Sequence, residues 1–216
     1  MKFLITAGPT REPIDPVRFI SNRSSGKMGY AVAEAAIAAG HDVVLVSGPV
    51  SISAPAGATL VNVMTSDEMH DAVHANVAST DIAVLSAAVA DFKPVEYIPR
   101  KIKKQDGGIT QLALVPTRDI LASLGAIYPR TFLLAGFAAE THDMERNASR
   151  KLREKRCDVI IANDVSRGDI GFEGDENEVT LFFVDQPSRV IPKASKRQLA
   201  FELVQTLTQM KKSVDL

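Results

Sequence analysis

The 216-residue sequence lacks most of the features that mark secreted, membrane or nucleic-acid-binding proteins. A single cysteine rules out a disulfide within the chain and is typical of a reducing compartment. No apolar run approaches the roughly 18 residues of a membrane span, and no signal-like apolar leader extends beyond Phe3–Ala7. The net charge is −1, whereas a dedicated nucleic-acid binder is normally basic. We therefore expect a cytoplasmic protein without a membrane or nucleic-acid partner.

The sequence also offers no recognisable metal site. Its four histidines are scattered, and only His70 and His74 have a spacing that places two rings on one side of a helix. No third ligand lies near them in the sequence, as a zinc site would require. We interpret the pair as part of an exposed polar helix face, and the metal ligands stay unassigned.

Short apolar runs recur along the chain at the length of buried strands. The strand candidates are Phe3–Ala7, Val43–Val46, Thr59–Met64, Ile82–Ala88, Phe132–Gly136, Val159–Ala162 and Val179–Val184.

Helical patterns fill many of the intervals between these runs. Thr65 and Glu68 form a capping-box pattern at the start of one helix, and Ser195 and Gln198 repeat it before the last helix. Gly40 is typical of the residue just after a helix end. The expected helices cover about 26–39, 65–77, 142–156 and 195–211.

Alternating strands and helices are typical of βαβ units, in which helices cover both faces of a parallel sheet. The chain length suits one substantial core, and no internal repeat divides it. We therefore predict an α/β fold, a Rossmann-like doubly wound, mainly parallel sheet, in a single domain of residues 1–216.

The segment Asp91–Thr117 breaks this pattern. It contains three prolines, the basic run Arg100–Lys104 and a Gly107-Gly108 turn followed by the apolar stretch Ile109–Leu114. Such a long connection in a compact domain is usually functional or disordered. We predict a flap with a hairpin arm, whose apolar face is covered by a second subunit.

The connection after the first strand has the residue types of an anion site. Gly26 and Gly29 alone are at least as typical of close helix packing, but Ser24, Ser25 and the cationic Lys27 beside them favour binding of a phosphate at a helix N-terminus. The dinucleotide pattern G-x-G-x-x-G is absent. No acidic residue ends the second strand, which counts against a hydride-transfer enzyme.

Three further patterns carry both a functional and an ordinary interpretation. Asp91, after a run of small residues, suits a nucleotide ribose or base, or it is a solvated loop residue. Lys151 and Lys155 share one helix side and suit a polyphosphate, or they are simply solvated. Asn163 ends a strand at the edge where ligands bind in such sheets, or it belongs to an ordinary turn.

Taken together, these motifs resemble the phosphopantothenate–cysteine ligase family of coenzyme A biosynthesis, also called phosphopantothenoylcysteine synthetase. The resemblance covers nearly the whole chain. It is carried by Ile5–Glu12, Ser21–Gly29, Ser86–Asp91, Lys101–Lys104, Gly136–Thr141 and Ala162–Val165.

The resemblance implies a ligation in two steps of the bacterial type. The carboxylate of 4′-phosphopantothenate attacks the α-phosphate of CTP with Mg²⁺ assistance, giving an acyl-cytidylate and pyrophosphate. The amine of L-cysteine then attacks the acyl carbon and displaces CMP. Both steps develop charge on oxygen, for which positioned amides and cations are suited.

The resemblance also implies roles for individual residues. Asn22 steadies the acyl-cytidylate carbonyl, and Lys101 on the flap faces the triphosphate. Nucleotide contacts are expected at Ser86, Ala87, Asp91, Lys101, Arg118, Asp119, Ile120, Leu121, Phe137, Lys151 and Lys155. Contacts with phosphopantothenate are expected at Gly8, Ser24, Ser25, Gly26 and Ala88.

Two positions depart from the family pattern: Arg118 stands where proline is common, and Pro116 replaces a frequent lysine. The family forms homodimers in which the flap contributes to the neighbouring site. In many bacteria the domain follows a flavin-dependent decarboxylase, and the sequence leaves open whether this chain stands alone.

Two other functions remain as alternatives to the ligase. An NADP-dependent reductase would need a catalytic dyad, but no Tyr-x-x-x-Lys spacing is present. A catalytically silent nucleotide sensor would bind without turnover, and the presence of Asn22 and Lys101 counts against it. The preference for CTP over ATP is an expectation from the resemblance.

Overall fold

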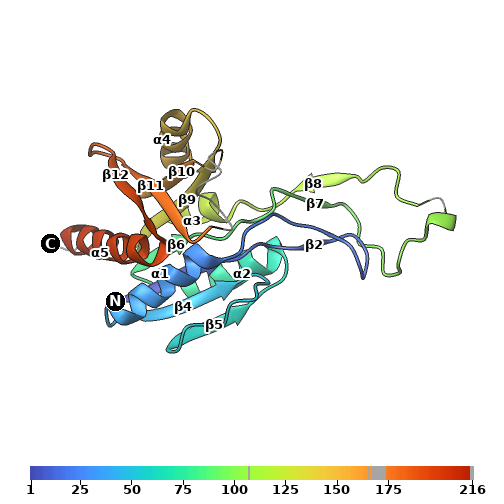
Figure 1. Ribbon diagram of the computed structural model, residues 1–216, viewed down its shortest axis with the longest axis horizontal. Coiled ribbons are helices and arrows are strands. Elements are labelled where there is room, and N and C mark those ends of the chain that lie inside the picture. The colour runs from blue at the N-terminus through green and yellow to red at the C-terminus, as the bar shows by residue number, and fades with distance from the viewer. Residues whose placement is uncertain (107, 165, 167–173, 215–216) are drawn as a thin grey trace.

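The computed structural model describes residues 1–106, 108–164, 166 and 174–214, and its centre is an eight-stranded sheet (Figure 1). The strand order is β12-β11-β10-β9-β6-β1-β4-β5, and all neighbours from β10 to β5 are parallel. Only β11 runs antiparallel to both of its neighbours. The strands are β1 Lys2–Ala7, β4 Asp42–Ser47, β5 Ala58–Asn62, β6 Ile82–Leu85, β9 Leu133–Glu140, β10 Val159–Asp164, β11 Glu176–Phe183 and β12 Arg189–Ser195.

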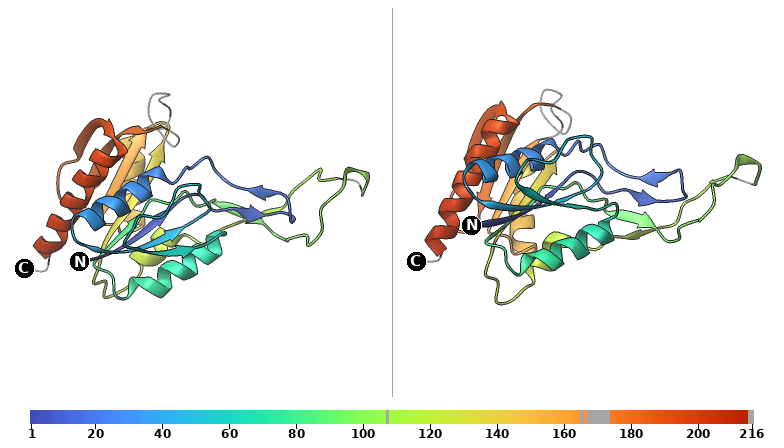
Figure 2. Two further views of the ribbon diagram at one scale, coloured as in Figure 1. Left: turned by 60° about the horizontal axis from the view of Figure 1, so that its bottom comes forward. Right: turned by 90° about the horizontal axis from the view of Figure 1, so that it is seen from below.

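Helices cover both faces of this sheet, as predicted (Figure 2). The first face packs against α1 (Lys27–Ala38) and α5 (Lys196–Val214), which also contact each other. The second face packs against α2 (Ser66–Val77), α3 (Ile120–Gly125) and α4 (Met144–Glu154). The predicted Rossmann-like, mainly parallel α/β fold is therefore confirmed.

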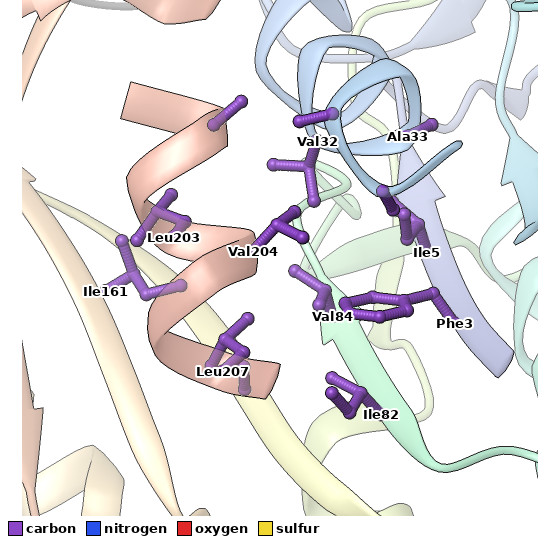
Figure 3. Packing of buried hydrophobic residues seen from close by; sticks show 14 of the residues in the cluster. Phe3, Ile5, Val32, Ala33, Ile82, Val84, Ile161, Leu203, Val204 and Leu207 are labelled. Carbon is purple, nitrogen blue, oxygen red and sulfur yellow. The ribbon is translucent and has the colours of Figure 1, made fainter. Parts of the chain in front are cut away.

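Strand β1 shows why both faces must be apolar. Successive side chains of a strand point to opposite faces, so Phe3 and Ile5 join the α1–α5 side while Leu4 joins the α2 side. Figure 3 shows Phe3 and Ile5 among Val32 of α1 and Val204 of α5. The continuous apolar runs of the sequence reflect burial on both sides.

Several boundaries and elements differ from the sequence prediction. The strand expected over Ile82–Ala88 ends at Leu85, and the residues after it leave the sheet. Strand β12 was not predicted because it is an edge strand with mostly exposed, partly charged residues. Helix α3 was missed because six residues are too few for a clear period. The connection between β1 and α1 contains a short antiparallel pair, β2 (Glu12–Pro13) with β3 (Phe19–Ile20), which was not predicted.

The predicted arm is present and extends away from the sheet (Figures 1 and 2). Its base is an antiparallel pair, β7 (Phe92–Pro94) with β8 (Leu114–Pro116), and a short 3₁₀ turn at Lys104–Asp106 lies farther out. Of the apolar stretch Ile109–Leu114, only Leu114 belongs to β8. Gly107 of the expected turn lies outside the described residues, as does Val165 of the last family motif.

Both predicted capping boxes are confirmed. Thr65 Oγ1 accepts a hydrogen bond from the Glu68 N–H at 3.2 Å, and Glu68 Oε2 accepts from the Thr65 N–H at 3.4 Å. Ser195 and Gln198 make the same reciprocal pair, at 3.3 Å in each direction. Gly40 has the left-handed φ of 78° expected just after α1.

Replacing the cap of α2 gives a test of this local structure. Thr65→Ala leaves the Glu68 N–H without its acceptor and should lower the free energy of unfolding by about 1 kcal/mol. Thr206→Ala is the matched control, because Thr206 bonds to a carbonyl within α5, where alanine is the better helix former. Chemical denaturation of the two variants measures the difference, and equal midpoints would contradict the role of the cap.

Candidate functional site

A cavity of about 600 Å³ lies at the carboxyl edge of the parallel strands. Ligands of open α/β sheets bind at this edge, because the strand-to-helix connections meet there. Its walls come from the start of α1, the segment after β6, the residues before and within α3, the ends of β9 and β10, and α4. The predicted site residues that line it are Asn22, Ser24, Gly26, Ser86, Ala87, Ala88, Asp91, Arg118, Asp119, Ile120, Leu121, Phe137, Lys151 and Lys155.

Glycines let the first helix start very close to β1. A Cβ at Gly29 would lie 2.6 Å from the Cβ of Ala7, so any larger residue there would push α1 away from the strand. Gly26 precedes the helix with a left-handed φ of 78°, a conformation that favours glycine. The packing interpretation of these glycines therefore holds. It also brings the N–H groups at the start of α1 to the cavity, where they suit an anion.

The segment after β6 is fixed by side chains from the first strand and its connection. Thr6 Oγ1 accepts a hydrogen bond from the Ala87 N–H at 3.1 Å, and Thr10 Oγ1 accepts from the Ala90 N–H at 3.0 Å. The Ala88 N–H donates to the Gly8 carbonyl at 2.9 Å. Gly8 thus holds this segment through its backbone carbonyl and does not itself line the cavity.

Asn22 connects the segment after β6 to the residues just before α1. Its side-chain amide donates to the Ala88 carbonyl, and its Oδ1 accepts from the Ser24 N–H at 3.2 Å. An asparagine amide carries two N–H groups. One is used by Ala88, so the geometry leaves a second donor for a molecule in the cavity.

The other end of the cavity combines an aromatic ring with charges. Phe137 projects from β9, while Lys151 and Lys155 come from one side of α4, as predicted. Lys155 pairs with Asp119 at 2.7 Å, and Asp119 also accepts from the Ala122 N–H at 2.7 Å as the cap of α3. Burial alone would raise the pKa of Asp119, but the Lys155 contact and the cap bond outweigh it and lower that pKa. Lys155 is therefore partly neutralised by the protein itself.

Arg118 ties this wall to helix α2. Its Nε contacts Asp67 Oδ1 at 3.0 Å, and its Nη1 contacts Asp71 Oδ1 at 2.8 Å. Lys93, at the base of the arm, also pairs with Asp67. The hydrogen bond from Lys93 is the main cause of a lowered Asp67 pKa, and the bond from Arg118 lowers it further. Arg118 thus anchors the wall through side-chain ion pairs.

Two other predicted residues lie outside the cavity. Ser25 lines a neighbouring hollow, which shares Asn22, Ser24 and Lys27 with the cavity. Lys101 lies on the exposed arm and does not contribute to the cavity wall.

The structure also adds cavity residues that the sequence predictions missed. Asn177 and Lys196 are both almost fully buried, and they reach the cavity from β11 and from the start of α5. Burial lowers the pKa of Lys196, and the nearby charge of Lys27 lowers it further. Sequence reasoning had no signal for either, because the antiparallel β11–β12 pair returns the chain to this edge. Asn163, proposed at the ligand edge, also lines the cavity.

Other reactive side chains have structural surroundings. Cys157 is buried, and burial raises the pKa of its thiol to about 12, so it is not a nucleophile near neutral pH. His74 bonds to Ser123 Oγ of α3 at 2.8 Å and its ring lies 4.3 Å from that of His70. The face was predicted to be exposed, but both histidines are half-buried, because α3, which was not predicted, packs against this part of α2.

Neither a metal cluster nor a membrane span emerges from the described residues. Over residues 1–106, 108–164, 166 and 174–214, no three histidine, cysteine, aspartate or glutamate side chains gather closely enough to hold a metal ion. No helix in the same ranges is long and apolar enough to cross a bilayer.

Known proteins are similar to this chain in sequence and fold. The coenzyme A biosynthesis bifunctional protein CoaBC of Bacillus subtilis (strain 168) is 49% identical over 210 residues, which are 97% of this chain and 51% of that protein. The chain therefore spans about half the length of this relative. A crystal structure of the C-terminal domain of a CoaBC protein has a TM-score of 0.82 at 39% identity, covering 99% of this chain and 95% of that one.

A more distant structure has the same fold. A Cab2 mutant in complex with phosphopantothenate-cysteine has a TM-score of 0.80 at 17% identity, covering 99% of this chain and 88% of that one. The family model described as DNA/pantothenate metabolism flavoprotein C-terminal domain matches residues 1–210. With nearly the full length matched, this chain belongs to the family of DNA/pantothenate metabolism flavoprotein C-terminal domains.

Proposed function

We propose that the chain ligates 4′-phosphopantothenate and L-cysteine to 4′-phosphopantothenoyl-L-cysteine, using CTP. The observation that carries this proposal is the cavity, which collects all the predicted site residues except Gly8, Ser25 and Lys101. The name of the Bacillus subtilis relative refers to coenzyme A biosynthesis, and the Cab2 structure contains phosphopantothenate-cysteine. Both support the assignment.

In the first step, the substrate carboxylate attacks the α-phosphorus of CTP, and the bond to the β-phosphate breaks as pyrophosphate leaves. Lys151 and the start of α1 supply positive charge to the phosphates. Phe137 offers a flat apolar surface to the base, and Asp91 offers a carboxylate to the ribose or base amine. Asp91 and Asp119 are the carboxylates that line the described part of the cavity, and Asp119 already pairs with Lys155, so a bound Mg²⁺ would depend largely on the phosphate oxygens of the nucleotide.

In the second step, the amine of L-cysteine attacks the acyl carbon, and the bond to the cytidylate oxygen breaks as CMP leaves. Negative charge builds on the carbonyl oxygen during this attack. We assign the donation to that oxygen to the remaining N–H of the Asn22 amide, which the contacts with Ala88 and Ser24 do not use. Asn22 therefore acts mainly in the second step.

The products formed with different nucleotides test the proposed function. Incubation with phosphopantothenate, L-cysteine, Mg²⁺ and CTP should give CMP, pyrophosphate and the ligated product, with far lower turnover when ATP replaces CTP. Chromatography and mass spectrometry measure all three products. Equal turnover with ATP removes the CTP preference but keeps the ligase. Oxidation of NADPH, or nucleotide binding without pyrophosphate release, would instead support the reductase or the sensor.

Asn22→Asp separates the two steps. Aspartate has nearly the same shape but replaces the amide donor with an acceptor, so the acyl-cytidylate should still form and should accumulate when cysteine is added. Mass spectrometry of the quenched reaction measures the intermediate. Asn62→Asp is the matched control, because Asn62 is exposed on β5 outside the cavity. Wild-type product formation by Asn22→Asp would refute the role of this amide.

The arm supports a further part of the proposal, a two-fold homodimer with shared sites. The arm leaves exposed the large side chains of Val95, Tyr97, Ile109 and Leu112, which a partner subunit can cover. Lys101 lies on the same arm and does not line the cavity of its own subunit. We therefore assign Lys101 to the triphosphate in the neighbouring subunit.

Mixing two inactive variants tests this sharing. Lys101→Gln should slow pyrophosphate release on the order of a hundredfold, because it removes a cation from the phosphates. After exchange of subunits between Asn22→Asp and Lys101→Gln, each mixed dimer regains one intact site. The mixture should then show about a quarter of wild-type product formation, as random pairing makes half the dimers mixed. No recovery, or full activity of a monomer, would contradict the shared site.

The cytoplasm is the compartment that we propose for this reaction. The single cysteine, buried in its reduced form, is consistent with reducing conditions.

A further inference from the structure

Asp15 lies at the tip of the β2–β3 hairpin and has an unusual environment for a carboxylate. Its side chain has no exposed surface, although the hairpin projects from the body of the protein beside the arm (Figure 1). A buried carboxylate is costly unless its oxygens receive hydrogen bonds. The partners of the two oxygens therefore indicate what the residue does.

The two carboxylate oxygens have different partners. Oδ1 accepts from the N–H groups of Val17 and Arg18, both at 2.8 Å, which is an ordinary arrangement for an aspartate in its own turn. Oδ2 accepts from Arg18 Nη1 at 2.9 Å and from the Ile102 N–H at 3.2 Å. The local turn explains Oδ1, but it does not explain a bond to a residue 87 positions away.

Arg18 completes a clamp on the same arm residue. Its Nη2 donates to the Ile102 carbonyl at 3.1 Å, so one ion pair holds both the N–H and the C=O of Ile102. The Ile98 N–H also donates to the Ile14 carbonyl at 3.0 Å. Burial alone would raise the pKa of Asp15, but hydrogen bonds from Val17, Arg18 and Ile102 lower it, so the residue is charged at neutral pH.

We propose that Asp15 is a positioning residue for Lys101, acting through its grip on Ile102. The strand pairing between β7 and β8 covers only the base of the arm, up to Pro94 and Leu114, and does not reach Lys101. A lysine ammonium sits on a long flexible stem, so the position of its backbone limits where the charge can reach. Fixing Ile102 fixes the neighbouring residue, and the hairpin thus directs Lys101. This inference rests on the proposed role of Lys101 in the neighbouring cavity.

Asp15→Asn tests the clamp without any assay of activity. The asparagine amide would point N–H groups at Ile102 or Arg18, so the bond to the arm is lost while the side chain keeps its size. Trypsin cleavage in the arm, at Arg100, Lys101, Lys103 and Lys104, should accelerate on the order of tenfold. Mass spectrometry follows the fragments. Asp185→Asn, in the exposed turn between β11 and β12, should cleave like the wild type.

Kinetics test the link to Lys101. Asp15→Asn should slow pyrophosphate release, and the double variant with Lys101→Gln should be no slower than Lys101→Gln alone, because both changes remove the same contact. If Asp15 were needed only for folding, Asp15→Asn would slow pyrophosphate release equally in the wild type and in Lys101→Gln, and it would lower the denaturation midpoint. Additive losses would overturn the positioning role.

The outcomes separate the clamp from the proposed function. Unchanged arm cleavage in Asp15→Asn overturns the clamp, and faster cleavage with wild-type pyrophosphate release overturns its link to Lys101. If the wild type releases no pyrophosphate, the proposed function fails and the cleavage result alone decides the clamp. If Asp15→Asn does not fold, Ile102→Pro removes the same hydrogen bond with the hairpin turn intact. For this variant, faster trypsin cleavage at Lys103 and Lys104 would support the clamp, and unchanged cleavage would overturn it.

Discussion

Burial of the sheet on both faces is the constraint from which the rest of the structure follows. Leu4 packs toward α2 and Ile5 toward α1 and α5, so β1 has no side left for water. Strands buried in this way run parallel, with helices as their connections. Their carboxyl ends then lie at one edge, where loops from distant parts of the chain meet. The cavity lies among these connections and the helix ends that they lead to.

The cavity itself is held by backbone contacts as much as by side chains. Thr6 and Thr10 bind the segment after β6, and Asn22 binds the same segment from the start of α1. These bonds fix the wall before any ligand arrives, and a preorganised wall loses little entropy on binding. The charges are balanced as well, since Asp119 holds Lys155 close to where the phosphates are proposed to lie.

The sequence predicted the parts of the fold that depend on local pattern. Thr65 and Glu68 specify the start of their helix through their own hydrogen bonds. The run Val159–Ala162 is apolar at every position, so its composition alone indicates a buried strand. Elements that depend on distant partners were missed. Strand β12 is defined by pairing with β11, and α3 by packing of Ile120 and Leu124 against the sheet. Lys196 and Asn177 were missed for the same reason, because only the antiparallel return brings them to the cavity.

Arg118 changes what controls the shape of the cavity wall beside α3. The proline common at this position in the resembling family would fix the backbone by a covalent ring, regardless of the solution. Here the same wall depends on ion pairs with Asp67 and Asp71, which are partly exposed. Both carboxylates have lowered pKa values, so these pairs persist until strongly acidic pH, but dissolved salt screens them at any pH. The shape of this cavity wall is thereby coupled to ionic strength, a dependence that a proline would not give.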